Sequence, residues 1–490
     1  MSHVFYSVIT LISMLSIIPS LSLNVLLIAP GWSSSHVMFN YRIATTLRDR
    51  GHNVTIFLHR MSAKLSISKP PDGIELITFM PSLSEDLREH SSTMFQNMAF
   101  QDANFTHFIE LSELFRQLVI QTCHEVLDDH ELIDYLRSKK IDIAFSHFFS
   151  SCPPGWSHRI GAEKFVWIAT GAFIFEHVAW QAQLPHISSY MPNHMMKGAS
   201  DRMTFTQRLT NLLWSSLLYL GILDEQGYFF WYESENSIFR RPPYHTNKDP
   251  DLYTLGAQAT TILINGEPFL DFPKPLLPGM VHLGELEEKV VKKLPEEWQK
   301  VMDESDAGVI IFSFGTVANT STMPLLLKEA FFKAFQTFPN YTVIWRLEGQ
   351  LPENLAKYPH IRLVKWFPQG DLLHHKKLKL FISHGGYNSF LESAQAGVPL
   401  VLMPLLIDQY ANAERAKKKG VGLILDKNTA TAESIQHAMR TVLNDPSFKK
   451  NALYLSAVLK DQIIPNQLVA VHQIERIAKA GHIWPTMKAA

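Results

Sequence analysis

Apolar runs alternate with amphipathic stretches along most of the chain. In the first half, "NVLLIAP" at 24–30 and "NVTIFL" at 53–58 flank a helical pattern near 37–50, which Gly51 ends. Short, continuous apolar runs separated by helices are typical of buried parallel strands in α/β proteins. The mature chain is therefore expected to open with a strand–helix–strand unit, and three further apolar runs before residue 170 extend the same sheet.

The second half begins near "TTILIN" at 260–265 and repeats this pattern after a proline-rich connector at 271–280, where we place the domain linker. The predicted strands are "GVIIFSF", "TVIWRL", "IRLVK", "LKLFI", "PLVLM" and "GVGLIL", with long helices near 324–338, 387–396, 408–419 and 431–442. Strands that alternate with helices predict a second parallel, doubly wound sheet. Residues 178–245 show no strand alternation and are expected to form short helices and loops over a cleft, or a helical cap.

The composition narrows the class of protein. The chain has 490 residues, of which 46% are hydrophobic and 19% charged, enough for about two to three domains with buried cores. Its formal net charge of −1 favours neither a nucleic-acid partner nor a trap for acidic substrates. The only cysteines, Cys123 and Cys152, make no disulfide framework and no Cys-x-x-Cys metal motif.

The N-terminus predicts a secretory signal. Val4–Ile18 is an apolar run of suitable length that Pro19 breaks, and Ser20-Leu21-Ser22 fits a cleavage pattern of small residues. We expect residues 1–22 to be a cleaved signal peptide; because no Lys or Arg precedes the run, an uncleaved anchor and a buried strand stay open. No later run reaches the roughly 18 apolar residues of a transmembrane helix. Four N-x-S/T sequons follow, at Asn53, Asn104, Asn319 and Asn340.

The segment 383–409, "SHGGYNSFLESAQAGVPLVLMPLLIDQ", carries the first candidate chemistry. An apolar strand runs directly into His-Gly-Gly, then a helix, then a second strand that ends in Asp-Gln. Glycines at such a turn let the backbone approach a ligand closely, and the helix start offers free N–H groups to a phosphate. Many α/β proteins carry such a turn without a ligand, so this segment alone does not decide the function.

Longer motifs carry a specific resemblance. They are "GWSSSHVMF" after the first strand, "SSYMP…SDRMTFTQRLTN" at 188–211, "DFPKPLLPGMVHLG" at 271–284, "GVIIFSFGT" from 308, "VIWRL" at 343–347 and the block "WFPQGDLLHHKKLKLFISHGGYNSFLESAQAGVPLVLMPLLIDQYANA" at 366–413. By these motifs the chain resembles the animal UDP-glucuronosyl/UDP-glucosyltransferase family over nearly its whole length. The resemblance implies an α/β GT-B fold, with two Rossmann-like, doubly wound parallel-sheet domains facing across a cleft.

The resemblance also implies a domain organisation. Residues 23–270 would form an N-terminal acceptor-binding domain, residues 271–448 a C-terminal UDP-sugar-binding domain, and residues 449–490 a helical tail packing back towards the N-terminal domain. Membrane-bound relatives continue into a transmembrane helix and a basic tail, where this chain stops at "AGHIWPTMKAA". A soluble luminal or secreted form and an incomplete sequence are both open.

The family's nucleotide contacts fall on residues whose chemistry suits the task. Trp366 and Gln369 resemble the reader of the uracil base, since an aromatic plane stacks and an amide satisfies the polar edge. His384 resembles a phosphate contact, with the Gly386 N–H nearby; Gly315 and Thr316 resemble a second loop near the phosphates. Trp366 would equally serve as a core residue.

The helix after the Gly-Gly turn holds the remaining nucleotide candidates. Asn388 and Ser389 resemble phosphate contacts, and Glu392 resembles the glutamate that holds the ribose hydroxyls. The alternative is helix capping, because Asn and Ser are good N-caps and Glu392 three residues after Ser389 fits a capping box. Asp408 and Gln409 resemble the pair that binds hydroxyls of the transferred sugar, with an ordinary acidic helix start as the alternative.

The acceptor side carries one departure from the family. His36 lies where the family places the general base that takes the proton of the acceptor hydroxyl. His147 lies where most relatives have the aspartate that orients this base. A neutral imidazole would orient His36 but not stabilise its protonated form. Asp142 begins the same strand, about 15 Å away by strand rise, and Glu176 is another candidate carboxylate.

The function that the resemblance implies is enzymatic: inverting transfer of glucose or glucuronic acid from a UDP-sugar to a hydroxyl of a small lipophilic acceptor, as in detoxification. The UDP-sugar is a co-substrate, and neither a cofactor nor a metal site is expected. We expect the lumen of the endoplasmic reticulum and no nucleic-acid partner; peripheral membrane association and the oligomeric state stay open. The alternative is a catalytically impaired UDP-sugar- or lipophile-binding protein, supported by His147. A metal enzyme or hydrolase is disfavoured, because the 22 histidines include no His-Glu-x-x-His motif and no Gly-x-Ser-x-Gly occurs.

Overall fold

The computed structural model describes residues 22–480 with internal gaps. These gaps are 62–64, 66, 83, 85, 86, 88–98, 102–104, 173, 175, 183, 194, 195, 220–238, 240–249, 278, 285, 287–292, 317 and 350–353. The predicted signal peptide therefore lies almost wholly outside the described residues. Among the described helices, none is long and apolar enough to cross a membrane.

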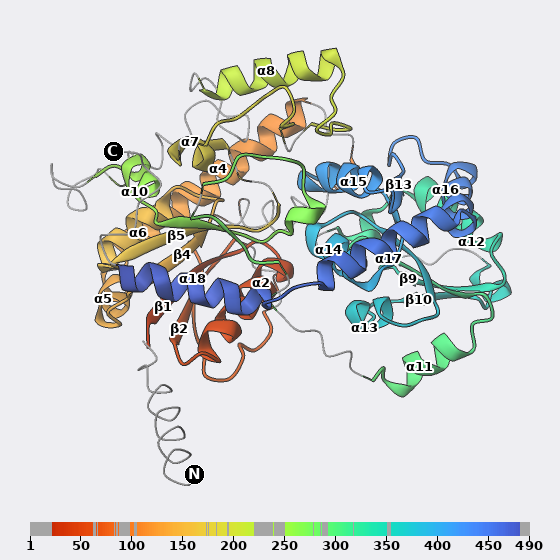
Figure 1. The fold of residues 1–490 in the computed structure, drawn as a ribbon, viewed down its shortest axis with the longest axis horizontal. Helices are drawn as coiled ribbons and strands as arrows, with labels where there is room; N and C mark the ends of the chain where they lie inside the picture. The colour runs from red at the N-terminus through yellow and green to blue at the C-terminus, as the bar shows by residue number, and fades with distance from the viewer. Residues whose placement is uncertain are drawn as a thin grey trace, which may run out of the picture.

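The first sheet has seven parallel strands in the order β3-β2-β1-β4-β5-β6-β7 (Figure 1). They are β1 (Asn24–Gly31), β2 (Asn53–Arg60), β3 (Glu75–Phe79), β4 (Ile143–His147), β5 (Lys164–Ala169), β6 (Thr261–Ile264) and β7 (Val281–His282). The helices between them are α2 (Ser34–Arg48), α4 (Phe105–Asp128), α5 (His130–Ser138), α6 (Cys152–Ile160), α7 (Glu176–Gln181), α8 (Phe205–Tyr219) and α10 (Leu252–Ala257). The central strands are buried along nearly their whole length, as continuous apolar runs predict.

The second sheet has six parallel strands in the order β10-β9-β8-β11-β12-β13. They are β8 (Gly308–Ser313), β9 (Tyr341–Arg346), β10 (Ile361–Val364), β11 (Leu378–Ser383), β12 (Leu400–Leu402) and β13 (Gly422–Ile424). Its helices are α11 (Glu296–Asp303), α12 (Leu325–Gln336), α13 (Gln369–Leu373), α14 (Tyr387–Ala396), α15 (Asp408–Lys418) and α16 (Ala432–Asn444). In both sheets the strand order reverses next to the first strand of the domain, which places a crevice at the carboxyl ends of the strands.

The domain boundary differs from the expected one. The run at 260–265 contributes β6 to the first sheet instead of opening the second half, and β7 at 281–282 extends that sheet beyond the proline-rich connector. An apolar run does not reveal which sheet it pairs with, because the pairing is decided by contacts distant in sequence. The N-terminal sheet therefore extends past the expected boundary at residue 270.

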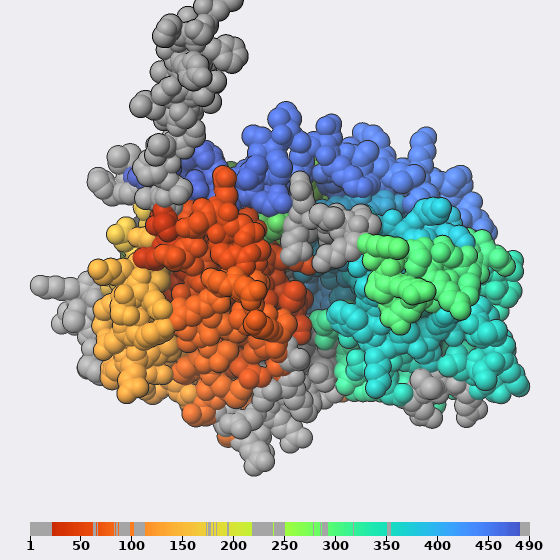
Figure 2. All heavy atoms as spheres, turned by 90° about the horizontal axis from the view of Figure 1, so that it is seen from below, coloured from red at the N-terminus to blue at the C-terminus, as the bar shows by residue number. Residues whose placement is uncertain are grey.

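The C-terminal tail divides between the two domains (Figures 1 and 2). Helix α17 (Pro446–Lys460) packs with Leu455 and Leu459 on the core beneath α14, so it belongs to the second domain. Helix α18 (Asn466–Ala480) buries Val471 and Ile474 in the core of the first domain, beside α2. Only the last helix thus packs on the N-terminal domain. In Figure 2 the blue C-terminal segment runs along both halves of the molecule.

Two loops of the first domain also contact the second. Ala99 is fully buried in the core of the second domain, and the neighbouring Phe100 ring lies 5.8 Å from the ring of Phe314. Lys197 forms an ion pair with Asp426 at 2.8 Å. These contacts join loops of the first domain to the second domain.

The two cysteines form a disulfide. Cys123 in α4 is bonded to Cys152 at the start of α6, with the two Cα atoms 5.9 Å apart and both residues buried. A pair of cysteines suggested no framework, yet the bridge joins two helices that pack on the same core. Disulfides persist in oxidising compartments, which fits a secreted or luminal chain.

Candidate active site

The Gly-Gly turn joins β11 to α14 as the sequence predicts. Helix α14 begins at Tyr387, and its N-cap is Gly386, which makes no side-chain cap. Asn388 and Ser389 therefore lie inside the first turn, and the alternative that they cap the helix is wrong. The amide groups of this first turn have no intrahelical partner and are available to an anion.

The ring of His384 lies between two glycines. A Cβ atom at Gly315 would lie 2.6 Å from the ring, and one at Gly386 would lie 2.5 Å from it, so both positions need glycine. Gly315 also has a φ of +73°, which favours glycine. His384 is buried, and its Nδ1 has no hydrogen-bond partner among the described residues. Burial, and then the charge of Arg346, lowers the pKa of His384 to about 4, so the ring is neutral at physiological pH.

Arg346 connects this turn to the expected base reader. From the end of β9, its guanidinium donates to the carbonyl of Gly315 at 2.7 Å and lies 4.9 Å from the centre of the Trp366 ring. Trp366 is 63% exposed, so the alternative that it serves as a core residue is wrong. Thr316 is exposed in the same turn as Gly315. The guanidinium over one face of Trp366 restrains the orientation of the ring, and much of the residue stays exposed to solvent.

Gln369 lies beside Glu392 and Ser389. Its Nε2 donates to the Glu392 carboxylate at 2.8 Å and to the Ser389 hydroxyl at 3.2 Å. Helix α13, which begins at Gln369, thereby brings the expected base reader to the expected ribose and phosphate contacts on α14. All three side chains are half-buried, as expected for groups at a crevice wall.

Asp408 and Gln409 begin α15 next to an unusual backbone. Ile407, which precedes them, has a φ of +36°, rare for a β-branched residue. The side-chain carbonyl of Gln409 supports this turn by accepting from the N–H groups of Leu405 and Leu406 at 2.9 and 3.0 Å. Asp408 accepts a bond of 2.9 Å from Asn412, and burial raises the pKa of its carboxyl to about 6.

On the first domain, His36 lies in the first turn of α2, just beyond the carboxyl end of β1. Its Nδ1 lies 2.8 Å from the hydroxyl of Ser33, which in turn lies 2.8 Å from the hydroxyl of Ser35. The ring packs edge-on against Phe149. His36 is partly exposed to solvent, yet desolvation of its ring lowers the pKa to about 4, so the ring is neutral.

His147 does not orient His36. It ends β4, is buried, and its Nε2 lies 2.9 Å from the Asn40 amide, which also donates to the backbone carbonyl of His36. Burial, and then the proximity of His36 and His59, lowers the pKa of His147 well below its usual value. Three neutral histidines therefore gather at the ends of β1, β2 and β4.

Of the two other carboxylates considered for His36, Asp142 is not placed to orient it. Asp142 accepts from the backbone N–H of Asn24, at the opposite end of β1. Glu176 begins α7, and its side chain is outside the described part of the chain.

The two sheet edges meet at α14. Asn265, which follows β6, donates to the side chain of Asn388 at 3.3 Å and to the carbonyl of Thr170. The hydroxyl of Tyr387 accepts from the backbone N–H of Glu267 at 2.7 Å. The Gly-Gly turn of the second domain thus lies against the carboxyl edge of the first sheet.

Comparisons with known proteins agree with this geometry. The family model described as "UDP-glucoronosyl and UDP-glucosyl transferase" matches residues 24–487. The chain belongs to this family. Its enzymatic class is therefore UDP-glycosyltransferase, which confirms the expectation from the sequence motifs.

Relatives cover most of the chain. A Caenorhabditis elegans protein named for UDP-glucuronosyltransferase activity, ugt-60, is 36% identical over 90% of this chain and 87% of its own length. Human UDP-glucuronosyltransferase 1A10 is 29% identical over 94% and 84%, and UDP-glucosyltransferase 2 of Dactylopius coccus is 30% identical over 91% and 82%.

Two solved structures are similar in fold. They are the glycotransferase of kitacinnamycin and the spinosyn forosaminyltransferase SpnP, with TM-scores of 0.60 and 0.61 at 16% identity, each over 93% of this chain and 99% of its own. They confirm the GT-B fold.

Four side chains at the site of this UDP-glycosyltransferase were not predicted from the sequence. Ser33 and Arg346 lie inside quoted motifs, and Asn40 lies one helical turn after His36, so their spacing was a usable signal. Asn412 lies one turn after Asp408. Among the residues that the structure describes, no three His, Cys, Asp or Glu side chains are arranged to hold a metal ion.

Proposed function

We propose that the chain transfers glucose or glucuronic acid from a UDP-sugar to the hydroxyl of a small lipophilic acceptor, with inversion at the anomeric carbon. The observation that carries this proposal is the contact of the two sheet edges, where Asn265 of the first domain donates to Asn388 of the second. It brings the domain that holds His36 against the turn that holds His384. A donor and an acceptor bound at these two edges would share one crevice.

On the donor side, each residue has a role matched to its contacts. Trp366 stacks on the uracil, and Gln369 with Glu392 binds the base and ribose, since these two side chains are already hydrogen-bonded to each other. The first-turn amides of α14, with Asn388 and Ser389, receive the diphosphate. Asp408 and Gln409 bind sugar hydroxyls, because a carboxylate and an amide together accept and donate several bonds.

On the acceptor side, His36 is the general base. With its Nδ1–H donating to Ser33 and Ser33 donating to Ser35, Nε2 carries the free lone pair. Nε2 takes the acceptor proton as the acceptor oxygen forms a bond to the anomeric carbon. The bond from that carbon to the diphosphate breaks on the opposite face, and UDP leaves with the electron pair.

The charge on the leaving group is met by the protein in this proposal. The α14 dipole and the guanidinium of Arg346 supply positive charge near the diphosphate, so we expect the reaction to need no resident metal or cofactor. The disulfide supports a place in the oxidising lumen of the secretory pathway.

A second candidate function is UDP-sugar binding without turnover. His147 favours it, because this neutral ring is bonded to Asn40 and supplies no negative charge to a protonated His36. Loss of such a carboxylate costs about 10⁴ in rate in enzymes with a catalytic triad. The structure of the donor half is the same under both functions.

The products distinguish the two functions. The purified chain is incubated with UDP-glucose or UDP-glucuronate and a panel of phenols and alcohols, and the conjugates are identified by mass spectrometry and proton NMR. A β-linked conjugate from one α-linked donor would establish inverting transfer and identify the sugar. Calorimetric binding of UDP-sugar without any conjugate would establish the binding protein.

A further inference from the structure

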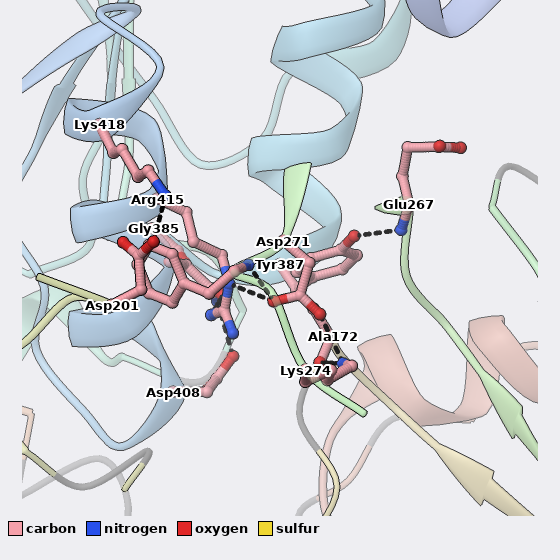
Figure 3. Close-up of polar contacts among 12 residues, drawn as sticks. Ala172, Asp201, Glu267, Asp271, Lys274, Gly385, Tyr387, Asp408, Arg415 and Lys418 are labelled. Atoms are coloured by element: carbon pink, nitrogen blue, oxygen red, sulfur yellow. Dashed lines mark hydrogen bonds and ion pairs between the residues drawn. The ribbon is translucent and has the colours of Figure 1, made fainter. Parts of the chain in front are cut away.

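A buried ion pair joins the first domain to the helix that carries the expected sugar-binding residues. It starts from the proline-rich segment at 271–280, which connects β6 to β7 within the first domain and is called the linker below. Asp271, just after the short helix at 268–270, accepts from the Arg415 guanidinium of α15 at 2.9 Å, and both side chains are only 6% exposed (Figure 3). Lys274 of the linker contacts the other carboxylate oxygen at 2.5 Å and also donates to the carbonyl of Ala172. Arg415 also lies over the ring of Phe272, 4.9 Å from its centre. The linker is thus fixed to α15 by charge and by packing.

The same guanidinium continues the contact towards the site. Arg415 donates to the side-chain oxygen of Asn412 at 3.0 Å, one turn earlier on α15. The Asn412 amide nitrogen then donates to Asp408 at 2.9 Å and to the carbonyl of Gly385 at 3.0 Å. Asn412 is 1% exposed, so its orientation is set wholly by these partners. We call the series Asp271–Arg415–Asn412–Asp408 the linker relay.

The buried charges of the linker relay stabilise one another. Burial by itself would raise the pKa of Asp271, but Arg415 and Lys274 hold it below the ordinary value, so the carboxylate is ionised. Buried ion pairs contribute little net stability compared with apolar packing, whereas removal of one partner leaves an unpaired buried charge. Such a pair fixes geometry: with Asp271 in place, the guanidinium has one favourable position, and so has the Asn412 amide that it holds.

The relay ends at two parts of the donor site. Asp408 is an expected sugar contact, and Gly385 belongs to the turn in front of the diphosphate. Because the Gly385 N–H also donates to the Ser383 hydroxyl, Asp408 is the member whose orientation depends most on Asn412. A change in the linker would therefore disturb the contact to the sugar more than the contacts to the nucleotide.

We propose that Arg415 and Asn412 are positioning residues that transmit the position of this β6–β7 linker of the first domain to the Asp408 carboxylate, so that the docked linker is required for recognition of the donor sugar but not of UDP. This rests on the proposed function, in which Asp408 binds the sugar. The two domains then assemble the sugar subsite only when the linker lies against α15.

The test compares UDP with UDP-sugars by calorimetry, so it does not depend on turnover. Asp271→Asn keeps the shape of the linker side chain but removes its charge, and Asn412→Ser shortens the relay while leaving the Asp271–Arg415 pair intact. For each variant the dissociation constants of UDP, UDP-glucose and UDP-glucuronate are measured, with the melting temperature as a check on folding. Lys197→Gln is the matched control, since it removes another ion pair between the two domains, to Asp426, in which no member of the relay takes part.

We expect Asp271→Asn and Asn412→Ser to weaken UDP-sugar binding about tenfold and UDP binding by less than about twofold, and Lys197→Gln to change neither. In an Asp408→Asn background, the two relay substitutions should add almost nothing, because the group that they position is already lost. Equal weakening of UDP and UDP-sugar, or fully additive effects with Asp408→Asn, would overturn the relay while the donor site stands. A wild-type chain that binds neither UDP nor UDP-sugar would overturn the proposed function and the relay with it.

Discussion

The side chain of Asn40 hydrogen-bonds the ring of His147, with Nδ2 2.9 Å and Oδ1 3.1 Å from Nε2. This contact occupies the nitrogen through which His147 would have reached a neighbour. The position where the family resemblance implied an aspartate is therefore filled by a neutral ring that is hydrogen-bonded to α2, and Ser33 contacts His36 instead. In the proposed mechanism, the general base His36 is thus oriented by a hydroxyl, with no negative charge behind it.

The pH dependence of the reaction follows from Asp408 more than from His36. Burial raises the pKa of Asp408 to about 6 and lowers the pKa of His36 to about 4, so above pH 6 the carboxylate is ionised and the imidazole neutral. We expect kcat/KM for the UDP-sugar to fall as the pH drops through about 6, because protonated Asp408 accepts sugar hydroxyls less well. Asp408→Asn should lower kcat/KM and remove this limb, leaving one near pH 4. A limb near pH 6 that persists in Asp408→Asn would contradict the assignment.

The glycine at 315 is required by the ring of His384. Gly315→Ala should weaken UDP binding at least about tenfold and destabilise the fold by roughly 2–4 kcal/mol, because the new Cβ would lie 2.6 Å from the ring at a left-handed φ. Gly161→Ala is the control: its φ is +75°, but nothing lies within 4 Å of the added Cβ. It should show only the backbone penalty of about 1 kcal/mol and unchanged UDP affinity. Denaturant unfolding and calorimetry measure both, and equal results for the two variants would refute the crowding.

The exposed ring of Trp366 should contribute to affinity and not to stability. Trp366→Ala is expected to weaken UDP binding by about 1–3 kcal/mol through lost base stacking, and Trp366→Phe to recover part of it. The melting temperature should stay nearly unchanged, since 63% of the residue is exposed. Phe205→Ala, which removes a 74% exposed ring on α8, serves as the control with wild-type affinity. Unchanged UDP affinity in Trp366→Ala would exclude the stack.

The disulfide should stabilise the first domain. The bridge spans 29 residues, and closing a loop of that length stabilises a fold by roughly 3–4 kcal/mol. The Cys123→Ala/Cys152→Ala variant should therefore unfold at a clearly lower denaturant concentration, and a reducing agent should lower the midpoint of the wild type but not of the variant. Identical midpoints for wild type and variant would show that the bridge does not form in solution.

Much of the fold could be predicted from the chain because the signals are local. Continuous apolar runs predicted β1 and β11, and the His-Gly-Gly turn predicted the start of α14 to within a few residues. The placement of β6 and β7 was not predictable in this way, since an apolar run pairs with whichever sheet packs around it. The capping alternative for Asn388 is wrong because the helix begins one residue earlier, at Tyr387, with Gly386 as the N-cap.

The residues of the site also differ in whether local sequence signals could predict them. Residues with a motif around them, such as Trp366, Glu392 and Asp408, could be named from the sequence. The contacts of Arg415 with Asp271 could not, because 144 positions separate them and no pattern marks the pair. The disulfide likewise joins residues that only the packing of α4 on α6 brings together.

In the proposed mechanism, His36 activates an acceptor that is held against a bound UDP-sugar. The most direct measurement is the initial rate of acceptor-dependent UDP release by wild type and His36→Ala, with His437→Ala on the surface of α16 as the control. We predict release with one of the two donors, a loss of about 10²–10⁴-fold in His36→Ala and none in His437→Ala, with UDP affinity equal in all three. Release that survives His36→Ala undiminished would contradict the account.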